Sequence, residues 1–380
     1  MAHAPARLEI LDDVSEPSRR EPAGDSIVAG SPIFIVGSMR SGSTLLRLIL
    51  DSHENIAIGA ETGFMGAVSA TKIIPGWIHG NEWYRRLEWT EDELDEKLRA
   101  FYTDMFGRYA ASHGKRRWGD KTPFHTSHIA QMARVFPDAV FVGIVRHPGA
   151  VAVSLHRKFH YTFEAAVSYW AATNTEMVRE ATKLGARFVA VRYEDVVVEG
   201  EPVMRELIRW LGEPWSPRLL QHERVQREKG TPRVADGSTS TRDAIDGTRA
   251  SSWPQALRSE NKLTLKGIAH LAAFFGYDPL NAYDRVLLPC SDGRKWLTDG
   301  SDLLARRAAW SGRIDFEVRL QAVVADADPV QLAIRLDQVE SALARVRSRK
   351  SVRLSDAIRT IRHGRSVRDV RAAYARLRGR

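Results

Sequence analysis

The stretch that most constrains the fold of this chain runs from Ser31 to Leu50 and reads SPIFIVGSMRSGSTLLRLIL. Its first part is a short apolar run ending at Gly37, which is typical of a buried parallel strand. A loop follows, and then a segment with leucine and isoleucine on one side, which predicts a helix. A strand, a glycine loop and a helix in this order form the setting of a phosphate-binding loop.

The loop departs from the nucleoside-triphosphate pattern G-x-x-x-x-G-K-[ST] at one decisive position. Gly37 and Gly42 occupy its glycine positions and Thr44 its last position, but Ser43 stands where the lysine should be. Arg40 lies inside the loop instead. Backbone N–H groups, hydroxyls and a guanidinium can still bind an anion. The pattern therefore predicts an anion cradle that differs from a triphosphate site.

Further strands and helices alternate along the chain. Apolar runs predict strands over Asp138–Val145 and Arg187–Asp195. Helices are predicted from the Thr90–Glu93 capping box to about His113, and over Pro123–Val135, Glu164–Leu184, Glu201–Gly212 and Leu265–Pro279. The polar stretch Arg224–Ser252 reads as a long loop. This alternation predicts an α/β fold, a three-layer P-loop-like domain with a central parallel sheet.

The positive charge of the chain is concentrated at its end. The net charge is +9, but residues 341–380 hold 13 of the 56 basic residues and only 2 of the 47 acidic ones. The remainder, 43 basic against 45 acidic residues, is nearly neutral, so a general nucleic-acid binder is not indicated. We expect a flexible leader over residues 1–30, the main domain over 31–290, and a helical, Arg-rich extension over 291–380.

The extension leaves three interpretations open: a solvated amphipathic helix, docking to an anionic membrane surface or acidic acceptor, and nucleic-acid binding. The single cysteine, Cys290, fits a reducing compartment. The longest apolar runs, such as 139–145, are too short to span a bilayer. We expect a cytoplasmic protein, and the membrane interpretation of the extension would add peripheral contact at the inner membrane surface. No Cys/His/Asp cluster has metal-ligand spacing, so no metal site is predicted.

The residue at the end of the second predicted strand restricts the class of ligand that the site can bind. In VFVGIVRHPG, Arg146 stands where a triphosphate enzyme places a magnesium-binding acid. A cation cannot hold Mg²⁺ but can bind another phosphate. The ligand is then a nucleotide with two separate anionic ends and no metal, which points to 3′-phosphoadenosine 5′-phosphosulfate (PAPS).

At these residues the chain resembles the PAPS-dependent sulfotransferases. GSMRSGSTLLRLILDSH is similar to their 5′-phosphosulfate loop, and FVGIVRHPGAVAVS to their 3′-phosphate motif. The resemblance extends in patches from about Pro32 to Pro279. It implies that Arg146 and Ser154 bind the 3′-phosphate. For the 5′ end it implies the loop residues Arg40, Ser41, Gly42, Ser43 and Thr44.

The pattern is most similar to the tyrosylprotein sulfotransferase-like branch in its bacterial form. IGAETGF resembles the branch segment with the catalytic base, which implies Glu61. DKTPF implies Lys121 near the bridging oxygen of the cofactor. Tyr193 matches a cofactor-binding tyrosine in RYED, and Ser240 matches a loop serine at the 3′-phosphate.

The resemblance implies a transferase that moves a sulfuryl group in line to an acceptor hydroxyl or amine. Glu61 would act as base, while Lys121 and Arg40 stabilise charge on the departing phosphate. His125 is the rival base; His53 and His147 are expected to be structural or surface groups. The alternatives are a nucleotide kinase or NTPase with a degenerate loop, and a non-catalytic protein that binds anionic surfaces through its tail.

The acceptor side is left open by the sequence. A small molecule, a glycoconjugate and a lipid all remain candidates, and a homodimer and peripheral membrane contact are further expected partners, without specific nucleic acid. The segment Thr71–Trp89 offers a plausible acceptor wall through its aromatic residues Trp77, Trp83, Tyr84 and Trp89.

Overall fold

The computed structural model describes residues 30–72, 83–230, 245, 247–282 and 297–316. A six-stranded sheet with the order β2-β3-β1-β4-β5-β6 forms its centre. The strands are β1 (Ile33–Val36), β2 (Ile56–Ile58), β3 (Arg117–Lys121), β4 (Val140–Val145), β5 (Phe188–Arg192) and β6 (Leu297–Asp299). The first five are parallel, and β6 pairs antiparallel with β5.

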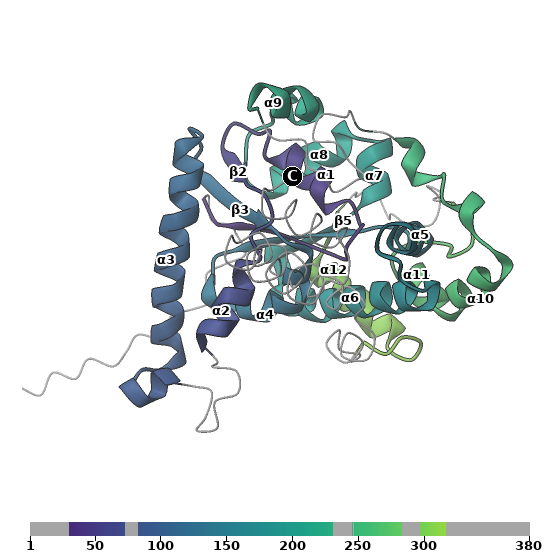
Figure 1. Ribbon diagram of the computed structural model, residues 1–380, viewed down its shortest axis with the longest axis horizontal. Coiled ribbons are helices and arrows are strands. Elements are labelled where there is room, and N and C mark those ends of the chain that lie inside the picture. Colours follow the sequence, from purple (N-terminus) through teal and green to yellow (C-terminus); the bar gives the residue numbers. More distant parts are fainter. Residues whose placement is uncertain (1–29, 73–82, 231–244, 246, 283–296, 317–380) are drawn as a thin grey trace, which may run out of the picture.

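Helices cover both faces of the sheet, which makes the fold three-layered (Figure 1). One face carries α1 (Ser43–Leu50), α7 (Tyr193–Val198), α8 (Glu201–Trp210) and α9 (His222–Glu228). The other carries α2 (Phe64–Lys72), α3 (Glu91–Ser112), α4 (Ile129–Val135), α6 (Phe163–Leu184), α11 (Ala269–Phe274) and α12 (Gly300–Trp310). At the carboxyl end of the sheet lie α5 (Pro148–Phe159) and α10 (Ser259–Gly267).

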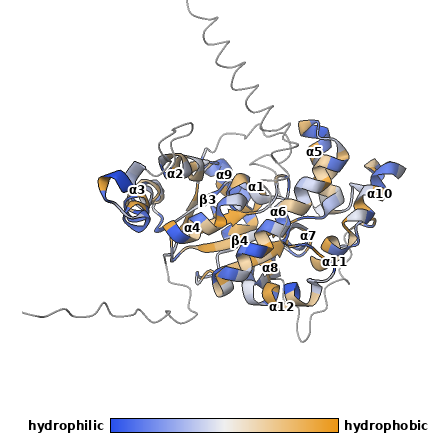
Figure 2. Cartoon of the chain, turned by 90° about the horizontal axis from the view of Figure 1, so that it is seen from below, coloured by the Kyte–Doolittle hydropathy of each residue, from blue (hydrophilic) through white to orange (hydrophobic). Residues whose placement is uncertain are grey.

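Two hydrophobic cores follow from the alternation of side chains along each strand. In β1, Phe34 and Val36 face the core under α2, α3, α4 and α6, whereas Ile33 and Ile35 face the core under α1 and α8. Phe34 lies at the centre of an aromatic group that includes Phe64, Trp118, Phe136 and Phe141. Figure 2 shows hydrophobic strands inside and hydrophilic residues on the outer side of α3 and α10.

The sequence identified three of the six strands, and the prediction of an α/β fold with a parallel centre is confirmed. The strand β3 was missed because its sequence, RWGDK, is polar although all five residues are buried. The buried guanidinium of Arg117 donates through Nε to the carbonyl of Ser31 and through Nη1 to that of Leu211, each at 2.6 Å. Such long-range partners cannot be seen in a local pattern.

Several predicted element bounds are corrected. The strand predicted to Asp195 ends at Arg192, because Tyr193 begins α7. The helix predicted over Pro123–Val135 starts as a 3₁₀ helix at Pro123–His128. The one predicted over Leu265–Pro279 is the two helices α10 and α11, which meet at Ile268. The predicted loop from Arg224 begins inside α9, and its residues 231–244 and 246 lie outside the described part. The capping box of Thr90 with Glu93 is present as predicted.

The sheet continues beyond the predicted domain boundary at residue 290. Strand β6 borders β5, and α12 packs on α6, where a Cβ at Gly300 would lie 2.5 Å from the carbonyls of Ala181 and Gly185. Residues 297–316 thus complete the main domain. The leader and residues 317–380 of the extension fall outside the described residues, as does Cys290. Among the described helices, none has the length and apolar character that crossing a membrane requires.

Candidate active site

The phosphate loop joins β1 to α1 and depends on two glycines. A Cβ at Gly37 would lie 2.4 Å from the carbonyl oxygen of Ile144, and one at Gly42 would lie 2.2 Å from the ring of Tyr193. Gly42 also has φ +96°, a conformation that other residues avoid. The loop is held from outside, because the Thr126 hydroxyl accepts from Gly37 N–H at 2.9 Å and the Tyr169 hydroxyl from Met39 N–H at 3.2 Å.

Arg40 is the loop residue that reaches across the site. Its backbone is left-handed, with φ +66°, which is uncommon for a residue with a side chain. Its Nε–H donates to Ser154 Oγ at 2.9 Å, and its carbonyl accepts from Arg146 Nη1 at 3.2 Å. The guanidinium of Arg146 lies 4.2 Å from the ring centre of Tyr193. The residues predicted for the 5′ and 3′ ends therefore form one connected group.

Lys121 ends β3 and joins the loop helix to the predicted base. Its side chain is only 1% exposed. The Nζ donates to Thr44 Oγ1 at 3.1 Å and forms an ion pair with the carboxylate of Glu61. Glu61 lies in the short segment between β2 and α2. Because parallel strands end at the same edge of a sheet, β1 and β3 deliver the loop and Lys121 to one place.

The rival base His125 is turned away from this place. Its ring is buried, with Nδ1 at 3.1 Å from Asp120 Oδ2 and Nε2 accepting from Met65 N–H at 3.4 Å. Asp120 also accepts from the Thr62 hydroxyl at 2.7 Å. His125 is thus a buried structural residue behind the Glu61 segment and does not line the cavity.

His53 and His147 have the structural roles that we expected. The Nε2 of His53 lies 2.7 Å from the Pro214 carbonyl. In His147, Nδ1 accepts from Gly149 N–H at 3.1 Å and Nε2 donates to the Asp278 carbonyl at 2.7 Å. Burial lowers the pKa of His147 to about 4, so the ring is neutral at physiological pH. Its face stacks on Trp253 at 4.1 Å and holds that ring in the cavity wall.

A cavity of about 650 Å³ opens between the loop, α5 and Tyr193. Among the described residues, four basic ones line it, Arg40, Arg146, Arg157 and Lys158, against one carboxylate, that of Glu61. A cavity with this charge suits a ligand with several negative charges. Its remaining lining is Met39, Gly42, Ser43, Thr44, Leu45, Pro123, Phe124, Ala150, Val153, Ser154, Phe159, Tyr193, Ser252 and Trp253.

Most of the predicted site residues meet at this cavity. Among the described ones, two do not line it. Lys121 is buried and reaches the lining through its contacts with Thr44 and Glu61. Ser41 is fully buried and its hydroxyl points into the loop, without a hydrogen-bond partner among the described residues. Ser240 lies outside the described residues. Of the predicted acceptor wall, the described aromatics Trp83, Tyr84 and Trp89 do not line this cavity, and Tyr84 belongs to the core. Trp77 lies outside the described residues.

Sequence reasoning missed the basic pair Arg157–Lys158 and the apolar residues Phe124 and Phe159. The pair follows Ser154 by three and four residues on α5, so helical spacing alone could have assigned it to the same face. Phe124 lies in the 3₁₀ turn after β3, within the helix predicted from Pro123, but a helix prediction does not indicate which of its side chains lines a cavity. Within the described residues, no three or more His, Cys, Asp or Glu side chains gather as a metal site.

Comparisons with known proteins agree with this geometry. The profile of the sulfotransferase family matches residues 32–217. Protein-tyrosine sulfotransferase 1 of Danio rerio is 28% identical over 262 residues, which are 65% of this chain and 72% of that protein. Protein-tyrosine sulfotransferase 2 of Gallus gallus is 28% identical over 263 residues, 65% of this chain and 69% of that protein.

Among solved structures, the sulfotransferase domain from the curacin biosynthetic pathway overlaps this chain with a TM-score of 0.46 and 21% identity. The overlap covers 64% of this chain and 98% of that domain. The family profile spans the phosphate loop, both basic strand ends and the segment of Glu61. The chain therefore belongs to the sulfotransferase family and is a sulfotransferase.

Proposed function

We propose that this sulfotransferase uses PAPS and moves its sulfuryl group to an acceptor hydroxyl, with Glu61 as general base. One observation carries the proposal: Arg40 of the loop, Arg146 at a strand end and the carboxylate of Glu61 line a single cavity of about 650 Å³. The buried ammonium of Lys121 pairs with that carboxylate, and 49% of the Glu61 side chain is exposed.

The residues present fit the two anionic ends of PAPS. The N-terminus of α1 has no side-chain cap, and its first residues line the cavity, so its N–H groups and dipole are available to a 5′-phosphosulfate. Arg146 and Ser154 line the same cavity and would hold the 3′-phosphate. Arg157 and Lys158 add positive charge there, and Trp253 and Tyr193 offer aromatic faces to the base.

When bound, PAPS supplies the sulfuryl group, which passes to the acceptor oxygen as the bond between sulfur and the bridging phosphate oxygen breaks. Glu61 takes the proton of the acceptor hydroxyl. Lys121 and Arg40 are cations beside the loop that would stabilise charge on the departing 5′-phosphate. The carboxylate of Glu61 is half exposed, with 49% of its side chain accessible, so an acceptor can reach it.

A kinase or NTPase reaction receives no support from these residues. Ser43 stands in place of the loop lysine, and Arg146 stands where a magnesium-binding acid would be required. The similar proteins of Danio rerio and Gallus gallus are protein-tyrosine sulfotransferases, so their acceptor is protein tyrosine. For this chain a phenolic or alcoholic hydroxyl is the proposed acceptor, whether on a protein, a small molecule, a glycoconjugate or a lipid.

Calorimetry with 3′,5′-ADP, ADP and ATP tests the cofactor. We expect 3′,5′-ADP to bind tightly and the other two weakly, and Arg146→Ala to weaken 3′,5′-ADP binding by tenfold to a hundredfold, on the order of 1.5–3 kcal/mol for charged hydrogen bonds. Glu61→Gln should bind 3′,5′-ADP normally and lose turnover. Equal affinity for 3′,5′-ADP and ADP would contradict the proposal.

We further propose a cytoplasmic enzyme whose Arg-rich end, residues 341–380, contacts anionic surfaces. The net charge of that segment, with 13 basic and 2 acidic residues, supports electrostatic attraction to anionic lipid. Flotation with phosphatidylserine vesicles at low and high salt, with and without residues 341–380, tests this contact. Binding that is independent of the segment would contradict it.

A further inference from the structure

The proposed base Glu61 lies in a segment without regular structure. Residues 59–63 connect the end of β2 to the start of α2. The Glu61 side chain is half exposed, and its carboxylate pairs with the buried ammonium of Lys121. The position of Glu61 relative to the phosphate loop therefore depends on this ion pair and on what holds the backbone on either side of the residue.

On the upstream side, a buried arginine of α1 holds this backbone. Arg47 is 5% exposed, and its Nη1 donates to the carbonyls of both Ile58 and Gly59 at 3.1 Å each. Burial lowers the pKa of Arg47 below its usual value, which is the signature of a guanidinium removed from water. Two main-chain carbonyls aimed at one nitrogen compensate such a group.

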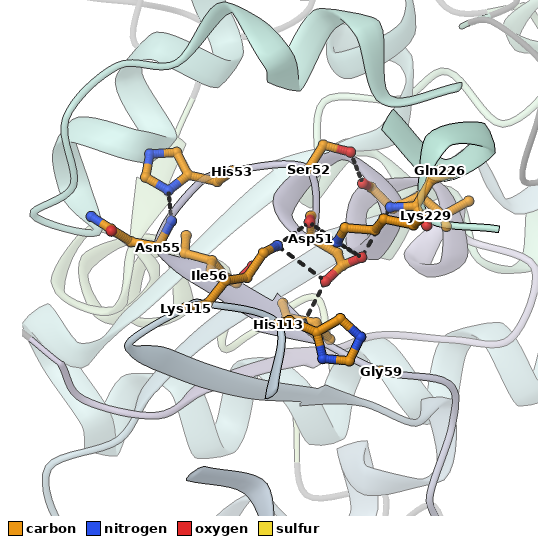
Figure 3. A network of polar contacts seen from close by, with 12 residues as sticks. Asp51, Ser52, His53, Asn55, Ile56, Gly59, His113, Lys115, Gln226 and Lys229 are labelled. Atoms are coloured by element: carbon orange, nitrogen blue, oxygen red, sulfur yellow. Dashed lines mark hydrogen bonds and ion pairs between the residues drawn. The ribbon is translucent and has the colours of Figure 1, made fainter. Parts of the chain in front are cut away.

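Asp51, the residue that follows the end of α1, binds the same backbone segment. Its Oδ1 accepts from Ile58 N–H at 3.1 Å. Strand β2 is the edge of the sheet and pairs with β3 on its other side, so Arg47 and Asp51 together satisfy both polar groups on the open side of Ile58. Figure 3 shows Asp51 fixed in turn by Lys115 and by Gln226 and Lys229 of the α9 region.

The downstream side of Glu61 is anchored by β3 and the residue after it. The Thr62 hydroxyl donates to Asp120 at 2.7 Å, and the Thr122 hydroxyl accepts from Gly63 N–H at 3.2 Å. The backbone is thus held on both sides of Glu61. Arg47 of α1 binds the residues before it, and the end of β3 binds the residues after it.

The same helix begins at the phosphate loop. Ser43 and Thr44 form its first turn and line the cavity, and Arg47 follows about 6 Å along the axis, given a rise of about 1.5 Å per residue. We propose that Arg47 is a positioning residue that fixes Glu61 relative to the phosphate loop, so that one rigid helix sets the distance between base and cofactor. This inference rests on the proposed role of Glu61.

Hydrogen–deuterium exchange of the full chain in the presence of 3′,5′-ADP tests the inference. In Arg47→Met we expect exchange of the 59–63 amides to rise about tenfold or more, because two bonds from a charged donor are lost. The affinity for 3′,5′-ADP should stay within about twofold, while kcat falls about tenfold or more. Arg47→Lys, which keeps one donor and the charge, should restore part of the protection and of kcat, and it serves if the methionine variant does not fold.

Arg117→Met is the matched control. Arg117 is 1% exposed and also donates to two main-chain carbonyls, those of Ser31 and Leu211, but neither belongs to the Glu61 segment. It should lower global stability and leave exchange of 59–63 within about twofold of the parent. Unchanged exchange in Arg47→Met, or an equal rise in Arg117→Met, would overturn the positioning role. If the parent protein did not prefer 3′,5′-ADP over ADP, the proposed function would be overturned. The exchange rates of the variants could still be compared with each other in that case.

Discussion

Arg40 Nε–H donates to Ser154 Oγ at 2.9 Å, which joins the loop after β1 to the middle of α5 across 114 residues of sequence. These two side chains were assigned to opposite ends of the proposed cofactor. Their direct bond means that the two ends of the site are coupled through one guanidinium. The carbonyl of Arg40 extends the coupling to Arg146 at 3.2 Å.

We therefore expect non-additive losses when both partners are removed. Arg40→Ala and Ser154→Ala should each weaken 3′,5′-ADP binding, and the double variant should lose less than the sum, with a coupling energy of about 1 kcal/mol. Calorimetry of the four proteins measures it. Arg108→Ala, an exposed arginine of α3 paired with Asp104, is the control and should leave affinity unchanged. Strict additivity would show that the Arg40–Ser154 bond contributes nothing to binding.

Gly42 should tolerate no side chain. Gly42→Ala places a Cβ 2.2 Å from the Tyr193 ring at a positive φ, so we expect a loss of about 3 kcal/mol in the free energy of unfolding and weaker 3′,5′-ADP binding. Gly114→Ala is the control that separates backbone strain from steric overlap. Gly114 also has a positive φ, +67°, but no atom lies within 4 Å of the position its Cβ would take. It should lose only about 1 kcal/mol. Urea unfolding measures both, and similar losses would contradict the role of Tyr193.

Lys121 should matter more for turnover than for stability. Lys121→Met removes the cation beside Thr44 and Glu61, and we expect kcat to fall about a hundredfold. Lys72→Met is the matched variant, because Lys72 is also buried and ion-paired, with Asp95 and Glu91, but lies away from the cavity. It should lose stability and retain kcat. Steady-state kinetics with an accepted hydroxyl compound decides between them, and equal kcat in both variants would exclude a catalytic role for Lys121.

Stability should fall on acidification through His147. Its folded pKa is lowered from 6.5 to about 4, so between these values the unfolded chain binds a proton that the folded protein does not. The contribution of neutral His147 is complete above pH 6.5 and is lost as pH falls to about 4. It amounts to roughly 3 kcal/mol from the linkage relation. In His147→Gln, urea unfolding across this range should show a shallower pH dependence; an unchanged slope would contradict the assignment.

The sequence by itself determined the class of the fold and the chemistry of the loop. Apolar runs at β1, β4 and β5, each followed by a helix, are local signals that survive in any context. The glycine spacing, the serine in place of lysine and the arginine after β4 are also local, and they separated this loop from a triphosphate site. Ser154, in the helix after Arg146, came from the resemblance to the 3′-phosphate motif of the family, and it lines the same cavity as Arg146.

Only the tertiary structure decided which polar residues serve the site and which serve the core. Ser41 and His125 sit in the right motifs but point into the protein, whereas Arg157, Lys158 and Phe124 line the cavity without a motif of their own. The burial of strand β3 and the contacts of Arg47 with the backbone before Glu61 depend on hydrogen bonds between segments that are not adjacent in sequence. Local patterns report the period and propensity of a segment, but the direction of a buried polar group is set by the partner that satisfies it. That partner exists only once the strands are assembled.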